Sequence, residues 1–192
     1  MFEFFRKYLE DKISIAEADY QLIESVCIFK KLRKHQFLLN EGDVCTHSGF
    51  VCKGFLRKYS VNDNGIEHTV YFATENWWIS DRQSLMNCTP SSYNIDAIED
   101  AVVLLISKSN IEMLSEKIPA FKDMVNLILQ RSLNATQERI NYALRSTAEE
   151  RYSQFLKSFP SLVHRAPRHM VASYLGITPE TLSRIRKQIS SK

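Results

Sequence analysis

The chain changes character near residue 107, and this change limits the folds that it can adopt. From about Phe29 to Ile106, short apolar runs alternate with turn signals such as Glu41–Asp43. From Ala120 to Phe159 the sequence contains neither glycine nor proline. Because these two residues interrupt helices, long helices are expected in the second half. The sequence therefore predicts a β-rich body followed by a helical end.

The β-rich body reads as short strands that form a sandwich or a rolled barrel. Asn62–Gly65 is a strong hairpin signal, because asparagine and glycine tolerate positive φ. In the strand after it, Ile66, His68, Val70 and Phe72 alternate with polar residues, so one face is expected to be buried. The predicted strands are 37–39, 50–61, 66–73, 93–98 and 101–106.

The helical segments carry start signals. Ser14–Glu17, Ser109–Glu112 and Thr147–Glu150 read as capping patterns, and Pro119 suits the first turn of a helix. A helix from 119 to 144 would be about 39 Å long. It would exceed the length that a small β-roll can cover, so we expect a second copy of the chain to cover the rest. The alternative is that this helix packs only against its own domain.

Composition indicates a globular protein without a membrane segment. The 192 residues are 44% hydrophobic and 24% charged, and no apolar run approaches the roughly 20 residues of a membrane helix. The first residues do not resemble a signal peptide, so a cytoplasmic location is expected. From Ser161 onward six basic residues face one acidic residue, a net charge of +5, whereas the preceding residues carry −2. This end favours a polyanion partner such as nucleic acid, or it is simply a solvated tail.

Cysteines and histidines do not indicate a metal site or an active site. The four cysteines form no Cys-x-x-Cys pair, so they are expected to be reduced and half-buried. Cys45, His47 and Cys52 lack both an established zinc spacing and a fourth ligand. Nucleophile-elbow, zinc-protease, dinucleotide and P-loop motifs are absent, and the histidines are scattered. We therefore expect no enzyme, no metal and no cofactor.

The most informative segment runs from Pro167 to Ile189. One short helix ends at Gly176, and Thr178 then offers an N-cap with Pro179 at the first helical position. In the second helix Leu182, Ile185 and Ile189 share an apolar face, opposite a polar and basic face. Two short helices with a glycine-containing turn predict a helix-turn-helix, the alternative being an ordinary helical hairpin.

The polar face suits the major groove of DNA. The fork of Arg184 can pair bidentately with guanine, and Glu180 can accept from cytosine or orient Arg184. These two residues are the candidates for base readout. The candidates for contacts with the DNA backbone are Arg168, His169, Thr178, Thr181, Ser183 and Lys187.

Residues 168–184, and most specifically the run Glu180–Arg184, closely resemble the helix-turn-helix of the Crp/Fnr superfamily of bacterial transcription regulators. The resemblance extends over nearly the whole chain and implies an α+β fold. Its parts would be a cyclic-nucleotide-binding-like β-roll (a double-stranded jelly roll with flanking helices) at 1–117, a dimerisation helix at 118–145 and a helix-turn-helix domain at 146–192. It implies a homodimer on palindromic double-stranded DNA, with RNA polymerase and a small-molecule effector as candidate further partners.

The sequence departs from the family pattern in two ways near the helix-turn-helix. Pro179 stands where the family often has Arg, Ser or Lys, and no β-hairpin wing is expected after the second helix. Fewer backbone contacts are then expected, so affinity would depend more on salt-sensitive contacts and on dimerisation. The alternative function is an effector-binding or protein-interaction module whose helical end docks a partner protein.

The sensor pocket of the resembled family also looks altered. Its phosphate-binding arginine is replaced by Ser91, its ribose-binding glutamate by Asp81, and its small alanine by Tyr93. Because a buried phosphate without a charge partner is costly, we expect no cyclic nucleotide to bind. The candidate effector pocket comprises Asp81, Arg82, Ser91, Ser92 and Tyr93. A different ligand could instead lie among Trp77, Trp78, Tyr71 and Tyr93, or these rings simply fill the core.

Overall fold

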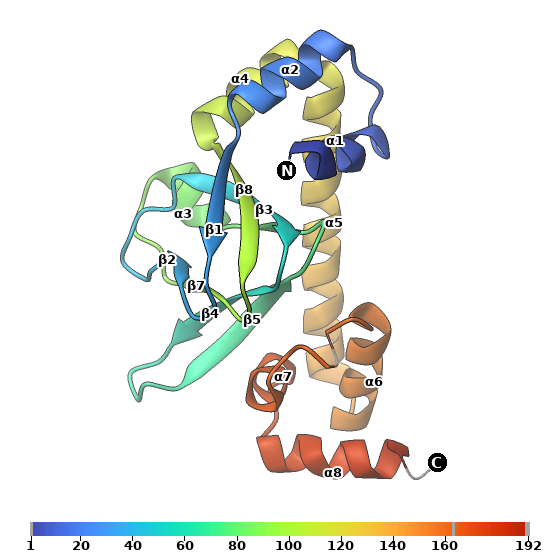
Figure 1. Cartoon of the computed structure of the whole chain (residues 1–192). Coiled ribbons are helices and arrows are strands. Elements are labelled where there is room, and N and C mark those ends of the chain that lie inside the picture. The colour runs from blue at the N-terminus through green and yellow to red at the C-terminus, as the bar shows by residue number, and fades with distance from the viewer. Residues whose placement is uncertain (1, 163, 191–192) are drawn as a thin grey trace.

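A computed structural model of the chain describes residues 2–162 and 164–190. Its centre is a β-roll of two four-stranded antiparallel sheets, with strand orders β1-β8-β3-β6 and β2-β7-β4-β5 (Figure 1). The strands of the first sheet are β1 (Ile28–Leu32), β3 (His47–Lys53), β6 (Trp78–Ile79) and β8 (Ala101–Ser107). Those of the second are β2 (Phe37–Leu39), β4 (Leu56–Val61), β5 (Glu67–Ala73) and β7 (Asn94–Ala97). The predicted β-roll is confirmed.

The expected continuous strand 50–61 is in fact two strands, because Gly54 turns the chain between β3 and β4. Gly54 has a φ of +98°, and a Cβ there would lie 2.6 Å from the backbone of Ala101. Both the left-handed conformation and the close approach require glycine. The hairpin at Asn62–Gly65 joins β4 and β5 as predicted.

The simple alternation expected for β5 is wrong in its first half. The pairing of β4 with β5 shifts between Lys58 and Tyr59, so Val70 is an extra residue in the ladder. Such a bulge reverses which side chains face the core. As a result Thr69 and Phe72 are buried, at 3% and 1% exposure, whereas Ile66 is 55% exposed.

Helices cover one face of the first sheet. These are α1 (Phe2–Glu10), α2 (Glu17–Ser25), α4 (Lys108–Lys117) and the first half of α5 (Pro119–Arg145). Phe5 and Leu9 of α1 are fully buried in a core shared with Phe50, Leu104 and Phe121. The sequence analysis did not predict α1, whose Phe5 ring contacts the rings of Phe50 and Trp78.

The predicted helix starts were correct at two positions and shifted at two others. Pro119 opens α5, and Thr147 caps α6 (Ala148–Ser158) in a reciprocal arrangement with Glu150. At α4, however, the cap is Ser107, whose hydroxyl accepts from the Asn110 amide at 3.2 Å. At α2 the helix begins after Ala16 instead of Ser14, and Asp19 accepts from the Ala16 amide. In both cases another side-chain oxygen within a few residues accepts the hydrogen bond at the helix start, in place of the serine that was expected to do so.

The long helix α5 runs past the β-roll and leads to the C-terminal helices α6, α7 (Arg168–Leu175) and α8 (Pro179–Ser190) (Figure 1). These helices share an apolar core with the β-roll, because Phe55, Phe72 and Ile98 pack with Phe155 and Val171. The C-terminal helices therefore lie against the β-roll, with α7 beside β5. Short α3 (Arg82–Asn87) lies between β6 and β7.

Within the described ranges, no helix combines the length and the apolar character that crossing a bilayer requires.

Candidate nucleic-acid interface

The two helices α7 and α8 are joined by a turn whose geometry follows from three residues. Gly176 ends α7 in the left-handed conformation, at φ 65°, and the Ile177 amide returns to the Ala172 carbonyl at 3.0 Å. Thr178 then accepts a hydrogen bond from the Thr181 amide at 3.2 Å. Pro179 begins α8, where it lacks only an amide that would have no helical partner. This is the helix-turn-helix that the spacing predicted.

The inner face of α8 anchors it on α6 and α7. Leu182 and Ile185 are 1% and 0% exposed and pack with residues such as Phe155 and Leu175. Ile189, which the sequence placed on the same face, is 41% exposed. Among the described residues, the buried apolar face of α8 therefore ends at Ile185.

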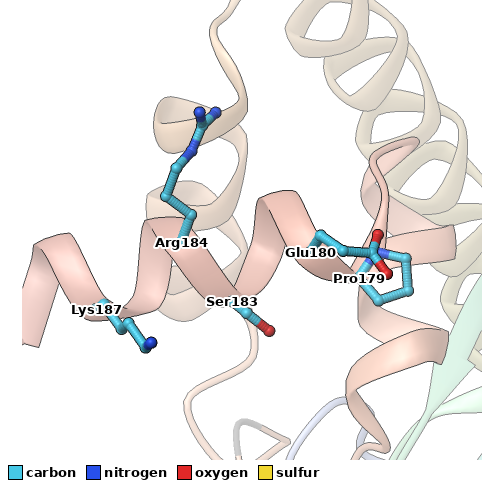
Figure 2. A pocket seen from close by; sticks show the side chains of 5 residues that line it. All are labelled: Pro179, Glu180, Ser183, Arg184 and Lys187. Carbon is cyan, nitrogen blue, oxygen red and sulfur yellow. The ribbon is translucent and has the colours of Figure 1, made fainter.

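The outer face of α8 carries the residues predicted to read DNA. Glu180, Ser183, Arg184 and Lys187 fall within one sector of about 100° around the helix axis and, with Pro179, line one surface pocket. Figure 2 shows Ser183 and Lys187 projecting in one direction and Arg184 in another, with Glu180 beside Pro179. Glu180, Arg184 and Lys187 are exposed. The described fold therefore presents a short cationic surface with one acidic residue at its start.

The charge of Glu180 is set by the start of the helix. The main-chain amide of Glu180 and the Thr178 hydroxyl lower the pKa of the Glu180 carboxyl, so it is an acceptor at neutral pH. Among the described residues no ion pair joins Glu180 to Arg184. The suggestion that Glu180 orients Arg184 therefore has no contact in this structure to support it.

The remaining candidates for backbone contacts lie at the starts of α7 and α8. Arg168 and His169 are exposed on the first turn of α7. Thr178 is exposed, but its hydroxyl is engaged as the helix cap, where it also donates to the Thr181 hydroxyl at 3.1 Å. Thr181 is half-buried beside it. The two threonines thus position the start of α8 in this structure.

Two of the five candidate effector residues, Asp81 and Ser91, form a buried polar cluster. The buried Asp81 carboxylate caps α3, accepting from the Gln83 and Ser84 amides at 3.1 and 3.4 Å. It also accepts from the buried Ser91 hydroxyl at 2.8 Å. Arg82 is exposed at the start of α3. Ser92 is also exposed, so these two do not join the cluster.

Sequence reasoning missed Lys58, which lies inside the β-roll next to the same cluster. Its ammonium donates to the Ser80 carbonyl at 3.2 Å and lies 5.0 Å from the centre of the Tyr93 ring. Burial lowers the pKa of the Lys58 ammonium, and the nearby Asp81 carboxylate opposes that shift. The roll interior therefore does hold a cation, contributed by a strand where no motif marks it.

The aromatic residues near the roll pack against protein. The Trp78 ring lies 5.3 Å from that of Phe50, and its indole donates to the Tyr8 hydroxyl at 3.2 Å. The Trp77 ring lies 5.5 Å from Phe159, just past the end of α6. These contacts agree with the interpretation that the tryptophans fill cores.

The fold places Cys45 and Cys52 in different cores. Cys45 packs in the core between the two sheets, whereas Cys52 packs under α1, and burial raises the pKa of the Cys52 thiol to about 11. No cluster of three or more metal-ligating side chains occurs among residues 2–162 and 164–190. Cys45, His47 and Cys52, which the sequence analysis set aside as zinc ligands, therefore form no such cluster in the described part of the chain.

Comparison with known proteins agrees with this architecture. The family of the cyclic nucleotide-binding domain matches residues 29–117. The transcriptional activator protein FnrA of Stutzerimonas stutzeri is 27% identical over 169 residues, covering 81% of this chain and 68% of that protein. The anaerobic regulatory protein of Aggregatibacter actinomycetemcomitans is 26% identical over 167 residues, and this match covers 81% of the chain but 64% of that relative. Among solved structures, FixK2 from Bradyrhizobium japonicum superposes with a TM-score of 0.76 at 21% identity, covering 86% and 85% of the two chains.

The order of β-roll, long helix and C-terminal helices is that of the FixK2 structure, whose fold this chain shares. Residues 29–117 match the cyclic nucleotide-binding domain, and the chain as a whole is similar to the two regulators named above.

Proposed function

We propose that the chain regulates transcription as a homodimer that binds a palindromic DNA site, with one α8 helix in each of two successive major grooves. The observation that carries the proposal is the outer face of α8, where Glu180, Arg184 and Lys187 are exposed on a helix whose other face is anchored in a core. A helix of this width fits the major groove of B-DNA. The relatives named above as an activator and as a regulatory protein support this role.

Base reading is assigned to two residues. Arg184 would donate bidentately to guanine, and the anionic Glu180 would accept from a cytosine amino group. Arg168, His169, Thr178, Thr181, Ser183 and Lys187 would contact phosphates and fix the register. The functional division that we propose is a sensor at 1–117, a dimerisation helix at 118–145 and a DNA-binding domain at 146–192.

Dimerisation is supported by an apolar face of α5 that its own chain leaves uncovered. Leu133, Ile140 and Leu144 are 59%, 54% and 79% exposed. They recur at spacings of seven and four residues, which places them on one side of the helix. A second α5 packed on this side would bury them, and the twofold axis would present two α8 helices to a palindrome.

We further propose that the effector, if the sensor binds one, is not a cyclic nucleotide. The Asp81 carboxylate already accepts two amides and the Ser91 hydroxyl, so it is not free to hold a ribose hydroxyl. Lys58 offers a cation, but the adjacent Asp81 carboxylate offsets its charge. Calorimetric titration with cyclic AMP is expected to show no binding at micromolar concentration, and saturable heat would contradict this part of the proposal.

The base-reading proposal is tested by selecting DNA sites from a random library and then changing Arg184. The Arg184→Ala variant is expected to bind the selected site more weakly, by a loss corresponding to about 1–3 kcal/mol, and to lose preference at the guanine it reads. Lys187→Ala serves as the comparison, since a phosphate contact weakens all sequences alike. Equal binding of the selected site by wild type and Arg184→Ala would overturn the assignment.

Salt dependence separates DNA binding from docking of a partner protein. Binding to DNA is expected to weaken steeply between low and moderate salt, because phosphate contacts release counterions. If binding to selected DNA is absent or insensitive to salt, the helical end is not a DNA reader.

A further inference from the structure

Arg165 lies in the loop between α6 and α7 and is bound by the β-roll. Its guanidinium makes five hydrogen bonds, which equals its number of N–H donors. It donates to both oxygens of Glu75 at 3.0 Å, to the Thr74 hydroxyl at 3.1 Å, and to Glu99 through Nε at 3.3 Å and also through Nη2. We call this group, Arg165 with Thr74, Glu75 and Glu99, the Arg165 clamp.

The clamp joins the DNA-binding end of the chain to three turns of the roll. Glu75 follows β5, and Glu99 lies in the turn between β7 and β8. Glu75 also accepts from the Gly54 amide, in the turn between β3 and β4, at 2.8 Å. One side chain therefore holds the loop before α7 against the end of the β-roll where these turns meet.

The clamp is only partly exposed and its charges are complementary. The side chains of Arg165, Glu75 and Glu99 are 26%, 33% and 38% exposed. Burial acts to raise the pKa of the Glu75 carboxyl, but hydrogen bonds from Arg165, Thr74 and the Gly54 amide hold it at about 2. Bidentate pairs of this kind fix orientation as well as distance, which separate monodentate contacts do not.

A second attachment holds α7 itself. The Ser173 hydroxyl accepts from the Thr69 amide and donates to the Glu67 carbonyl, both at 2.9 Å. Arg139 of α5 donates to the Val70 carbonyl and stacks over Tyr174 at 4.8 Å. Because α7 and α8 share one apolar core, α8 is carried by these contacts and cannot turn independently of them.

We propose that Arg165 is a positioning residue for DNA recognition: by fixing the helix-turn-helix on the β-roll, it sets the separation between the two half-sites that the dimer accepts. This inference rests on the proposed function. Adding or removing one base pair between half-sites shifts one of them by about 3.4 Å along the DNA and rotates it about the axis. A rigidly held pair of α8 helices rejects such operators, whereas loosely held helices follow the shift.

The experiment measures affinity for a series of operators that share the selected half-sites and differ by one or two base pairs in the spacer. For wild type, each one-base-pair change is expected to weaken binding about tenfold, comparable to mismatching a contacted base pair. For Arg165→Ala, the affinities for operators of different spacer length are expected to lie within about threefold of one another. Base substitutions within a half-site are expected to weaken its binding as much as they weaken that of wild type. Arg165→Lys cannot bridge both carboxylates and is expected to lie nearer to Ala than to wild type.

A second variant separates positioning from a direct phosphate contact by Arg165. The pair Glu75→Gln with Glu99→Gln leaves every basic residue in place and weakens the clamp from the roll side, so it is expected to flatten the spacer profile as Arg165→Ala does. Arg33→Ala, an exposed arginine of the β1–β2 turn, is the matched control and keeps the wild-type profile. Thermal unfolding checks that each variant is folded.

Three results would overturn the inference. In the first, the clamp variants keep the wild-type dependence of affinity on spacer length. In the second, they bind all operators more weakly by one common factor. In the third, they bind all operators more tightly, which would mean that the clamp holds α8 away from DNA. If wild type selects no DNA sequence at all, it is the proposed function that fails, and the two failures are distinguishable.

Discussion

At the residue scale, Arg57 of β4 is a charged side chain buried in the β-roll, at 4% exposure. It donates to both oxygens of Asp96, at 2.9 and 3.2 Å, and to Glu67 at 2.6 Å, and it stacks over Tyr59 at 3.9 Å. Arg57 and Asp96 stand opposite each other in the register of β4 and β7. Breaking such a pair is costly because the partner that remains stays buried and charged.

We therefore predict that Asp96→Ala lowers the free energy of unfolding by about 3–5 kcal/mol. Glu67→Gln is the control, since the Glu67 side chain is 44% exposed and its pairing is expected to contribute less than about 1 kcal/mol. Chemical denaturation at fixed protein concentration measures both. A loss at Asp96 no larger than that at Glu67 contradicts the prediction.

The depressed pKa of Glu75 predicts a pH dependence. Because the folded-state pKa is about 2, below the ordinary carboxyl value, the stabilisation by Glu75 is fully present above the ordinary pKa and is lost as pH falls through the folded one. The difference in stability between wild type and Glu75→Gln is thus expected to be constant near neutral pH and to shrink below about pH 4.5. Parallel thermal scans of the two proteins between pH 7 and pH 3 measure it. If the difference in stability between wild type and Glu75→Gln grows as pH falls, the prediction is wrong.

At the element scale, the helix-turn-helix was predictable because its signals are local. Gly176, Thr178 and Pro179 each act within four residues, through a left-handed C-cap, a hydroxyl cap and a pre-set φ. The pattern of buried and exposed side chains in β5 was not predictable, because the bulge at Val70 depends on how β4 pairs with β5. Local turn chemistry can be read in the sequence, whereas the phase of a strand also depends on its neighbour.

The turn between α7 and α8 yields a prediction of its own. Gly176→Ala is expected to destabilise the C-terminal helices by about 1–2 kcal/mol, because alanine is strained at φ 65°. A steric clash is not the cause of the expected loss, since a Cβ at position 176 would contact only Arg151 Nη1, at 3.8 Å. Gly176→Asn tolerates the conformation better and is expected to lose less. Hydrogen exchange of the α7 and α8 amides reports the effect, and equal losses for both variants would show that the backbone conformation is not the reason.

At the scale of the whole molecule, α5 has an apolar side that the described residues leave uncovered. A helix of 27 residues extends well beyond the roll, and its first half is buried through Phe121 and Met124. Its second half exposes Leu133, Ile140 and Leu144.

We predict that Ile140→Glu converts the proposed dimer into a monomer, because a carboxylate between the two α5 helices of that dimer would be buried without a partner. The variant is also expected to lose affinity for the palindrome while keeping weak binding to a single half-site. Glu138→Gln, on an exposed position of the same helix, is the control. Analytical ultracentrifugation at micromolar concentration measures the change, and a wild-type protein that is already monomeric rules out the paired-helix arrangement.

The sequence by itself determined the order of β-rich body, long helix and helical end, the Asn62–Gly65 hairpin and the helix-turn-helix, because each depends on periodicity and caps within about ten residues. Only the tertiary structure brought Lys58 beside Asp81 and bound Arg165 to Glu75, partners 90 residues apart in the chain. It also decided that Asp81 and Ser91 bond to each other within the roll. Charged groups that are distant in sequence carry no periodic signal, and their pairing is decided only when the sheets and helices pack and remove them from water.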